Sequence, residues 1–361
     1  RMALDYCQSM SLKDRHIFEK VFGLKDEMVF ADDFTVELYQ IQALNTDEIP
    51  LIDSANDNIK KLFWSEERSF TEKNFKWALK ECKKFGTIST YVVLLYNVYI
   101  TCKLSNESLY NYLIDIQKMR YDNQIGDIGY YLLELLKPLQ DEYSTVPEKA
   151  KKLIEIEINF GGILEWENMC CFQNEIKRVP DIYAEMAAVV LKKDDLDKEE
   201  ITESKNKFIK AIYRLYDKAH FCPAEKNGVV NLNDLEKWVK DLKTLLDKSH
   251  QTSLFGFLLG RLWVYSPVGN DNYFPCEAVR EIIEKYADDS MISAYKAALF
   301  NQRGIFTPSA GYEEREIAEK YKNTANYFKL RYPKTSEIFF DMYRKYIAEA
   351  EAERNRAENG Y

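Results

Sequence analysis

Apolar residues recur along the chain with the 3.6-residue period of an amphipathic helix, from one end to the other. No run of strict alternation, which is typical of a half-buried strand, interrupts them. The pattern therefore predicts an all-α protein. Besides two helices discussed below, it places helices at residues 107–119, 125–139, 147–159, 166–176, 184–191, 208–219, 234–247, 312–330 and 334–355.

Helix ends are marked by polar residues and glycines. A helix after Thr71 carries Leu79 and Cys82 on one face, and Gly86 is expected to end it as a left-handed C-cap. The next helix is expected to begin near Thr87 and to run through the apolar stretch Ile88–Ile100.

Two further local signals fall in the second half. Asn233 stands three residues before Glu236, which resembles a capping box at the start of the helix at 234–247, and Asn227-Gly228 marks a turn before it. In the apolar block Leu254–Tyr265, two glycines, Gly256 and Gly260, are expected to permit close contact between helices.

Three regions follow from these patterns. Residues 1–191 read as irregular helical hairpins, and each helix has one strong apolar face while none is apolar all round. This favours an α-solenoid-like array, with a compact multi-helix bundle as the alternative. Residues 192–205 form the most charged stretch and are expected to be an exposed connection or the start of a helix. Residues 206–361 then form a helical C-terminal domain.

Charge and cysteine content narrow the class of protein. The chain has 361 residues, with 50 Lys and Arg against 59 Asp and Glu, and its formal net charge of −9 disfavours a nucleic-acid binder. Its seven cysteines are scattered and lack a CxxC motif, so neither a zinc ribbon nor a disulfide framework is expected. A reducing, cytoplasmic location is the simpler expectation.

No membrane segment is expected, because the longest apolar stretch, Ile88–Ile100, falls short of the roughly 20 residues that a spanning helix needs. The first residues already resemble the middle of a helix and lack a signal-peptide pattern. We therefore expect the chain to be a piece of a longer polypeptide.

Sequence motifs of known chemistry are absent. The chain contains no GxxxxGK[ST], GxGxxG, GxSxG or HExxH motif. The segment Asn270-Asp271-Asn272 lacks both the glycine and the glutamate that a calcium-binding EF-hand loop requires. Neither a metal nor a cofactor is expected.

One catalytic alternative rests on Arg214 and His220 in the segment RLYDKAH. Their spacing is that of the metal-independent ribonucleases of the HEPN class, in which a helix presents both groups to the 2′-hydroxyl and the scissile phosphate. Six residues make about one and two-thirds helical turns, which directs the two side chains to different faces unless the helix ends between them.

A second set of candidates combines arginine with aromatic residues, the composition of interface hot spots. As a partner-binding surface we single out Arg261, Trp263, Tyr265, Tyr273, Arg280, Arg303 and Arg315. The alternative is that Trp263 and Phe274 fill the core while the arginines cap helices or pair with acidic residues, namely Glu277, Glu284 and Glu313.

The second half also resembles a known group of proteins. The segments that carry the resemblance are PDIYAEM (180–186), LLGRLWVYSP (258–267), Pro275 with AVREIIE (278–284), FNQRGI (300–305), GYEEREIAEKY (311–321) and YPKTSEIF (332–339). They are similar to the C-terminal helical region of large, uncharacterised bacterial multidomain proteins of antiviral-defence type. The resemblance implies a sensor array that follows an effector or NTPase domain, and it transfers no catalytic residue.

Together these observations predict a non-catalytic scaffold or sensor region that binds another protein. The ribonuclease using Arg214 and His220 is the rival hypothesis. A purely oligomeric subunit is a third, and it would require a large, apolar and self-complementary face.

Overall fold

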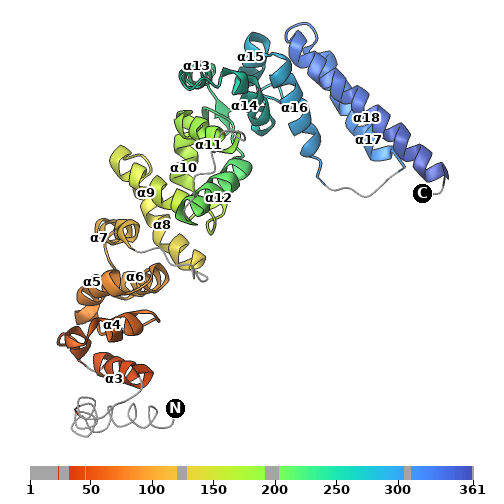
Figure 1. Cartoon of the computed structure of the whole chain (residues 1–361). Helices are drawn as coiled ribbons and strands as arrows, with labels where there is room; N and C mark the ends of the chain where they lie inside the picture. Colours follow the sequence, from red (N-terminus) through yellow and green to blue (C-terminus); the bar gives the residue numbers. More distant parts are fainter. Residues whose placement is uncertain are drawn as a thin grey trace. The chain divides into compact units, whose positions relative to one another are not determined.

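The computed structural model describes residues 23, 32–44, 46–119, 128–191, 203–304 and 310–359. Over these residues the protein contains sixteen α-helices, several short 3₁₀ turns and one two-stranded hairpin, which confirms the predicted all-α class (Figure 1). The chain divides into two compact units, Arg1–Cys171 and Phe172–Tyr361, called here the first and the second unit.

The first unit is a succession of helices that pack on their neighbours in the sequence. α6 contacts α5, α7 and α8, and α8 contacts α9. Its helices are α3 (Asp32–Leu44), α4 (Asp57–Trp64), α5 (Phe75–Phe85), α6 (Ile88–Cys102), α7 (Asn106–Leu113), α8 (Gly129–Tyr143) and α9 (Pro147–Asn159), with 3₁₀ turns at Leu51–Ser54, Glu72–Asn74, Ile114–Lys118 and Trp166–Asn168. The solenoid-like arrangement of residues 1–191 stays a prediction.

The junction between α5 and α6 shows how closely local sequence signals are obeyed. The Thr87 hydroxyl accepts a hydrogen bond from the Thr90 N–H at 3.1 Å, and the Thr90 hydroxyl accepts one from the Thr87 N–H at 3.0 Å. This capping box confirms the predicted start of the helix. The predicted left-handed C-cap is wrong, because Gly86 is extended, with φ of −87° and ψ of −177°. Glycine is needed there since a Cβ would lie 2.7 Å from the Cys82 carbonyl oxygen.

α6 is the central helix of the first unit. Its residues Tyr91, Val92 and Leu95 are at most 1% exposed, and the Tyr91 hydroxyl donates to the Tyr112 carbonyl at 3.0 Å. The prediction of a core helix at Ile88–Ile100 is thus confirmed. Within the described ranges, no helix combines the length and the apolar character that crossing a membrane requires.

A buried carboxylate joins the last elements of the first unit. Glu157 of α9 is fully buried, and its Oε1 accepts hydrogen bonds from the Gln140 side chain at 2.7 Å and from the Cys171 N–H at 3.1 Å. Gln140 of α8 also donates to the Asn168 carbonyl at 2.7 Å. Because buried polar groups are costly unless bonded, this network fixes α8 and α9 against the segment that follows them.

The second unit contains most of α10 and all later elements. They are α10 (Cys170–Arg178), α11 (Asp181–Leu191), α12 (Glu203–Lys218), β1 (Glu225–Lys226), β2 (Val229–Val230), α13 (Leu232–Lys248), α14 (Phe255–Leu262), α15 (Glu277–Tyr286), α16 (Asp289–Asn301), α17 (Tyr312–Phe328) and α18 (Pro333–Asn359), with 3₁₀ turns at Thr252–Leu254 and Trp263–Tyr265. Residues 192–202 of the predicted connection lie outside the described residues, so that connection stays a prediction.

The turn predicted at Asn227-Gly228 is confirmed as the turn of the hairpin, with φ of 53° and 78° at its two residues. Positive φ at both central positions is the geometry of a tight two-residue hairpin turn. The capping box predicted at Asn233 is wrong by two residues. Asn231 is the N-cap of α13, and its side chain accepts from the N–H groups of Asn233 and Asp234.

α14 and α16 cross closely, as the glycines of the apolar block predicted. A Cβ at Gly260 would lie 2.4 Å from the Met291 carbonyl oxygen and 2.8 Å from the Ala294 Cβ. At Gly256 a Cβ would meet the carboxylate of Asp288, the N-cap of α16, at 2.3 Å. Close approach of the two helices therefore depends on both glycines.

α17 and α18 lie side by side along much of their length (Figure 1). Aromatic rings fill the seam between them, and Tyr321 stacks on Tyr346 with a centroid distance of 5.6 Å. Glu284 of α15 accepts hydrogen bonds from the backbone N–H groups of Lys334 and Thr335 at 3.1 and 2.8 Å. A carboxylate at a helix N-terminus satisfies free backbone donors, so Glu284 fixes the start of α18 to α15.

Candidate functional site

In the structure, the seven arginine and aromatic candidates fall into separate environments. Arg280 and Tyr273 belong to a buried anchor of the loop before α15. Arg303 and Arg315 lie around the start of α17, and Trp263 lies in the core. Arg261 and Tyr265 join two residues outside the original set in a cluster that we call the Arg261 cluster: Arg261, Tyr265, Tyr216 and His220.

Trp263 is a core residue of the second unit. Its side chain is fully buried, and the indole N–H donates to the Met291 sulfur at 3.4 Å. These contacts agree with the alternative that Trp263 fills the core rather than binding a partner.

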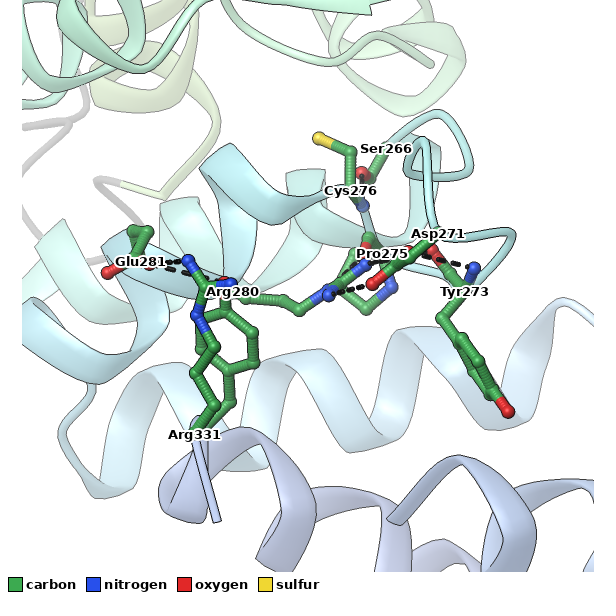
Figure 2. A network of polar contacts seen from close by, with 9 residues as sticks. Ser266, Asp271, Tyr273, Pro275, Cys276, Arg280, Glu281 and Arg331 are labelled. Carbon is green, nitrogen blue, oxygen red and sulfur yellow. Dashed lines mark hydrogen bonds and ion pairs between the residues drawn. The ribbon is translucent and has the colours of Figure 1, made fainter. Parts of the chain in front are cut away.

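Arg280 organises the loop between the 3₁₀ turn at Trp263–Tyr265 and α15. It is 1% exposed, and two of its nitrogens each donate to one oxygen of Asp271 at 2.7 Å (Figure 2). Further hydrogen bonds run to the carbonyls of Pro275 at 2.6 Å and Tyr273 at 3.2 Å. Hydrogen bonding to Arg280 lowers the pKa of Asp271 below its ordinary value. The guanidinium is therefore engaged within the protein.

The same arginine connects this loop to the region between α17 and α18. Its guanidinium carbon lies 4.5 Å from the ring centroid of Phe328 and 5.2 Å from that of Tyr332. Tyr273 stacks on Tyr327 at 3.8 Å with nearly parallel planes. Arg280 and Tyr273 thus bind the loop to the end of α17. A further hydrogen bond, from the Tyr332 hydroxyl to Glu281 of α15, links residues 51 positions apart in the same region.

Arg303 holds the start of α17. It is paired with Glu313 at 3.3 Å and with the buried carboxylate of Glu314. Glu313 is one of the three acidic residues named above as alternative partners of the arginines. Glu353 of α18 accepts a hydrogen bond from the Gly311 N–H at 3.1 Å, which brings α18 to the same place. Arg315, one turn further along α17, is exposed.

The Arg261 cluster forms where α12, the segment after it and α14 meet. Arg261, in the last turn of α14, is half-buried, and its guanidinium carbon lies 4.4 Å from the ring centroid of Tyr216. The His220 ring stacks on Tyr265 at 4.7 Å with an interplanar angle of 19°. Arginine over an aromatic face is a favourable cation–π arrangement.

Two buried tyrosines, Tyr183 and Tyr216, pack against each other in the interior part of the cluster. Tyr183 stacks on Tyr216 at 5.9 Å, and its hydroxyl donates to the Leu258 carbonyl at 3.2 Å. Burial raises the pKa of Tyr216, and the positive charge of Arg261 opposes that rise. Burial likewise raises the pKa of Tyr265, where Arg261 opposes the rise and Asp217 adds to it. The cluster is therefore an arginine held among tyrosine rings, with one carboxylate, Asp217, in its electrostatic neighbourhood.

The catalytic pair of the rival hypothesis is not assembled by these contacts. Arg214 is exposed on α12, whereas Ile212, Leu215 and Tyr216 are buried on the other side of that helix. α12 ends at Lys218, and His220 beyond it stacks on Tyr265. In the part of the chain that the structure describes, no hydrogen bond joins Arg214 to His220.

The sequence indicated Arg261 and Tyr265, which are four positions apart, but contained no signal that Tyr216 is a neighbour of Arg261. Tyr216 lies 45 positions before Arg261 in the sequence, and only the tertiary structure brings the two side chains together. Among the described residues no cluster of His, Cys, Asp and Glu side chains could hold a metal ion. Comparison of the chain with protein-family models, curated proteins and solved structures finds no match.

Proposed function

We propose that this chain is a non-catalytic recognition region that binds another protein through the second unit. The observation that carries the proposal is the Arg261 cluster, where a half-buried arginine lies over Tyr216 and acts electrostatically on Tyr265, whose ring stacks on the exposed His220. Arginine and tyrosine are enriched in the residues that dominate binding energy at protein interfaces. The supporting rings are fixed by buried neighbours, so ordering them on binding costs little entropy.

Three of the remaining candidates, Arg280, Arg303 and Trp263, have structural roles, whereas Arg315 is exposed. Arg280 and Arg303 are engaged in ion pairs inside the second unit, and Trp263 is buried. They hold the loops and helices in place. The contact residues in this proposal are therefore Arg261 and Tyr265.

The resemblance of the second half to helical regions of bacterial antiviral-defence proteins supports a more specific form of the proposal. In that form the chain is the scaffold or sensor region of a larger cytoplasmic protein, and it acts on an effector or NTPase domain. Any signal passed to such a domain would require a partner that binds two states of the whole protein with different affinity.

A pull-down experiment tests the proposal. The chain is immobilised and exposed to lysate of its source organism, with and without phage infection, and retained proteins are identified by mass spectrometry. The test variant is Arg261→Ala/Tyr265→Ala, and Arg315→Ala serves as a matched control because Arg315 is an exposed arginine of the same unit. A retained protein is then purified and its affinity for all three chains is measured.

We expect one protein to be retained by the parent chain and the Arg315 control and lost by the double variant. Equal retention by all three chains would contradict the proposed surface. Degradation of added RNA that is abolished by His220→Ala, with the fold intact, would instead establish the ribonuclease hypothesis.

A further inference from the structure

The connection between α17 and α18 carries the most exposed large apolar side chain of the described residues. Leu330 is 98% exposed, although Phe328 and Tyr332 on either side of it are at most 3% exposed. The Phe328 carbonyl accepts hydrogen bonds from the N–H groups of Arg331 at 3.1 Å and Tyr332 at 2.7 Å, which closes the turn. Leu330 is therefore displayed to solvent by a turn whose neighbouring residues are in the core.

Buried contacts fix this turn to the rest of the second unit. The rings of Phe328 and Tyr332 meet edge to face at 5.9 Å, and the guanidinium carbon of Arg280 lies 4.5 Å from the Phe328 centroid. The backbone N–H groups at the start of α18 donate to Glu284 of α15. Because the turn is already ordered, a contact made by its exposed side chains costs little backbone entropy.

Tyr327 extends the exposed apolar surface. It lies three positions before Leu330, in the last turn of α17, and is 51% exposed. Its ring stacks on Tyr273 at 3.8 Å, so the ring is held in place while half of the residue stays open to solvent. A single exposed leucine is common on protein surfaces. A leucine beside a fixed, half-exposed tyrosine is more informative, since tyrosine is enriched at protein interfaces.

The charged side chains of the connection and of the start of α18 are basic. Lys329, Arg331 and Lys334 are exposed, and within the described residues no ion pair reaches Lys329 or Lys334. Arg331 lies 3.5 Å from Glu281, and both side chains of this pair are largely open to solvent (Figure 2). This end of the second unit therefore has an excess of positive charge, although the formal net charge of the chain is −9. A partner that complements it is acidic.

These basic residues fit a protein segment better than an anionic lipid surface. Polybasic membrane anchors contain about four to eight lysines and arginines, and this surface has three. The negative charge of the whole chain also opposes its approach to an anionic bilayer. A short acidic segment has to match only the local charges.

We propose that this surface, called here the α17–α18 tip, binds an acidic amphipathic segment of a partner protein. The tip consists of Tyr327, Lys329, Leu330, Arg331 and Lys334. Apolar side chains of the segment pack on Leu330 and Tyr327, and its carboxylates pair with the three basic residues. The tip shares no residue with the Arg261 cluster, so this inference does not rest on the proposed function.

The test uses the full chain, with a phage-displayed library of random peptides as the probe. Retained peptides are sequenced and synthesised, and their affinities are measured by fluorescence anisotropy at low and high salt. We expect the retained peptides to combine Asp or Glu with Leu, Ile or Phe. Their binding should weaken at high salt, because exposed ion pairs are screened.

One pair of variants tests the apolar contact. Leu330→Ser should weaken peptide binding about tenfold, since it removes most of the apolar area that the tip offers. The fold should be unchanged, because the side chain is exposed. Leu232→Ser, at another exposed leucine of the second unit, should leave binding unchanged.

A second pair tests the charge. Lys329→Glu/Arg331→Glu places like charges opposite the carboxylates of the peptide and should weaken binding at least about a hundredfold. Lys237→Glu/Lys248→Glu makes the same change in net charge at two exposed lysines of α13 and should leave binding unchanged.

Acidic peptides whose binding depends on both Leu330 and the basic pair would establish the tip as a binding surface. Recovery of no peptide above background, of peptides without acidic residues, or of peptides that bind all variants equally would overturn the inference. The chain is also sedimented with vesicles of phosphatidylcholine and phosphatidylserine. Vesicle binding that Leu330→Ser abolishes would assign the tip to a lipid surface and overturn the inference as well.

Arg261→Ala/Tyr265→Ala separates the tip from the proposed function and should leave peptide binding unchanged. If peptides bind at the tip but no protein from lysate is lost by this variant, only the proposed function is wrong. If protein capture depends on Arg261 and Tyr265 but acidic peptides do not bind at the tip, only the inference about the tip is wrong.

Discussion

The side-chain hydrogen bonds between elements span shorter sequence separations in the first unit than in the second. In the first unit, side-chain hydrogen bonds between elements span 29 positions from Gln40 to Ser69 and 42 positions from Lys149 to Glu107. In the second unit, they span 51 positions from Thr335 to Glu284, 62 from Trp238 to Ile176 and 75 from Tyr183 to Leu258. We infer that the first unit responds to damage locally, whereas the second responds as a whole.

A buried carboxylate of the first unit and a buried guanidinium of the second unit are matched by different groups. The carboxylate of Glu157 in the first unit accepts hydrogen bonds from an amide side chain and a backbone N–H. In the second unit, the guanidinium of Arg280 is matched by the carboxylate of Asp271 and by two backbone carbonyls. The first arrangement joins consecutive helices, while the second joins a loop to a distant pair of helices.

The largest expected effect comes from breaking the Arg280 anchor. Arg280→Met retains side-chain volume but leaves Asp271 and two carbonyls without their partner, and loss of one member of a buried pair costs about 3–5 kcal/mol. Urea titration of the full chain measures the lost free energy of unfolding. Hydrogen exchange should then show faster exchange of backbone amides throughout α14–α18. Arg315→Met, at an exposed position, should change stability by less than about 0.5 kcal/mol. A loss confined to residues 266–280 would show that the second unit is not one cooperative body.

A cavity in α6 tests the contrasting behaviour of the first unit. Leu95 is fully buried, and Leu95→Ala should cost about 3 kcal/mol through lost contacts and the cavity left behind. If helices are stabilised mainly by their neighbours, hydrogen exchange should rise in α5–α8 and much less in α3. Leu62→Ala, at a side chain that is 39% exposed, is the control and should have a smaller effect. Equal exchange throughout the first unit would contradict a solenoid-like array.

Much of the fold was accessible from the sequence because helices leave local signals. The predicted helix at 147–159 coincides with α9, and the predicted start near Thr87 coincides with the capping box of α6. The close helix contact at Gly260 was also predictable, since a glycine inside an apolar helix has few other reasons to be there. These features depend on residues that are near one another in the sequence.

The candidate site was less accessible because its geometry depends on distant residues. The sequence placed Arg280 and Arg261 in the same set of arginine and aromatic candidates. One is buried on Asp271, and the other lies on Tyr216 with no ion pair in the described part of the chain. Asn231 and Asn233 show the same limit at short range. Both lie at the start of α13, and Asn231, which has an extended backbone just before the helix, is the cap, whereas Asn233 is already the second residue of the helix.

An intermediate effect is expected at the crossing of α14 and α16. A methyl group at Gly260 would lie 2.4 Å from a backbone oxygen of Met291, so Gly260→Ala forces the helices apart. Overpacking of this kind costs about 1–3 kcal/mol. Thermal unfolding measures the loss, and Ser293→Ala on the exposed side of α16 is the control. An unchanged midpoint would mean that the two helices do not pack as closely as the structure shows.

The smallest effect should be the same in both units, because helix capping is local. Thr87→Ala removes the hydroxyl that accepts from Thr90 N–H and should cost about 1 kcal/mol, while Thr87→Ser should retain most of the stability. In the second unit, Asp288→Asn corresponds to Thr87→Ser, because it keeps an acceptor for the Met291 N–H, and it should likewise retain most of the stability. Hydrogen exchange should rise only in the first turn of α6 for Thr87→Ala. If it rose across α3–α9 instead, the first unit would be as cooperative as the second, and the long hydrogen bonds of the second unit would not be what distinguishes the two.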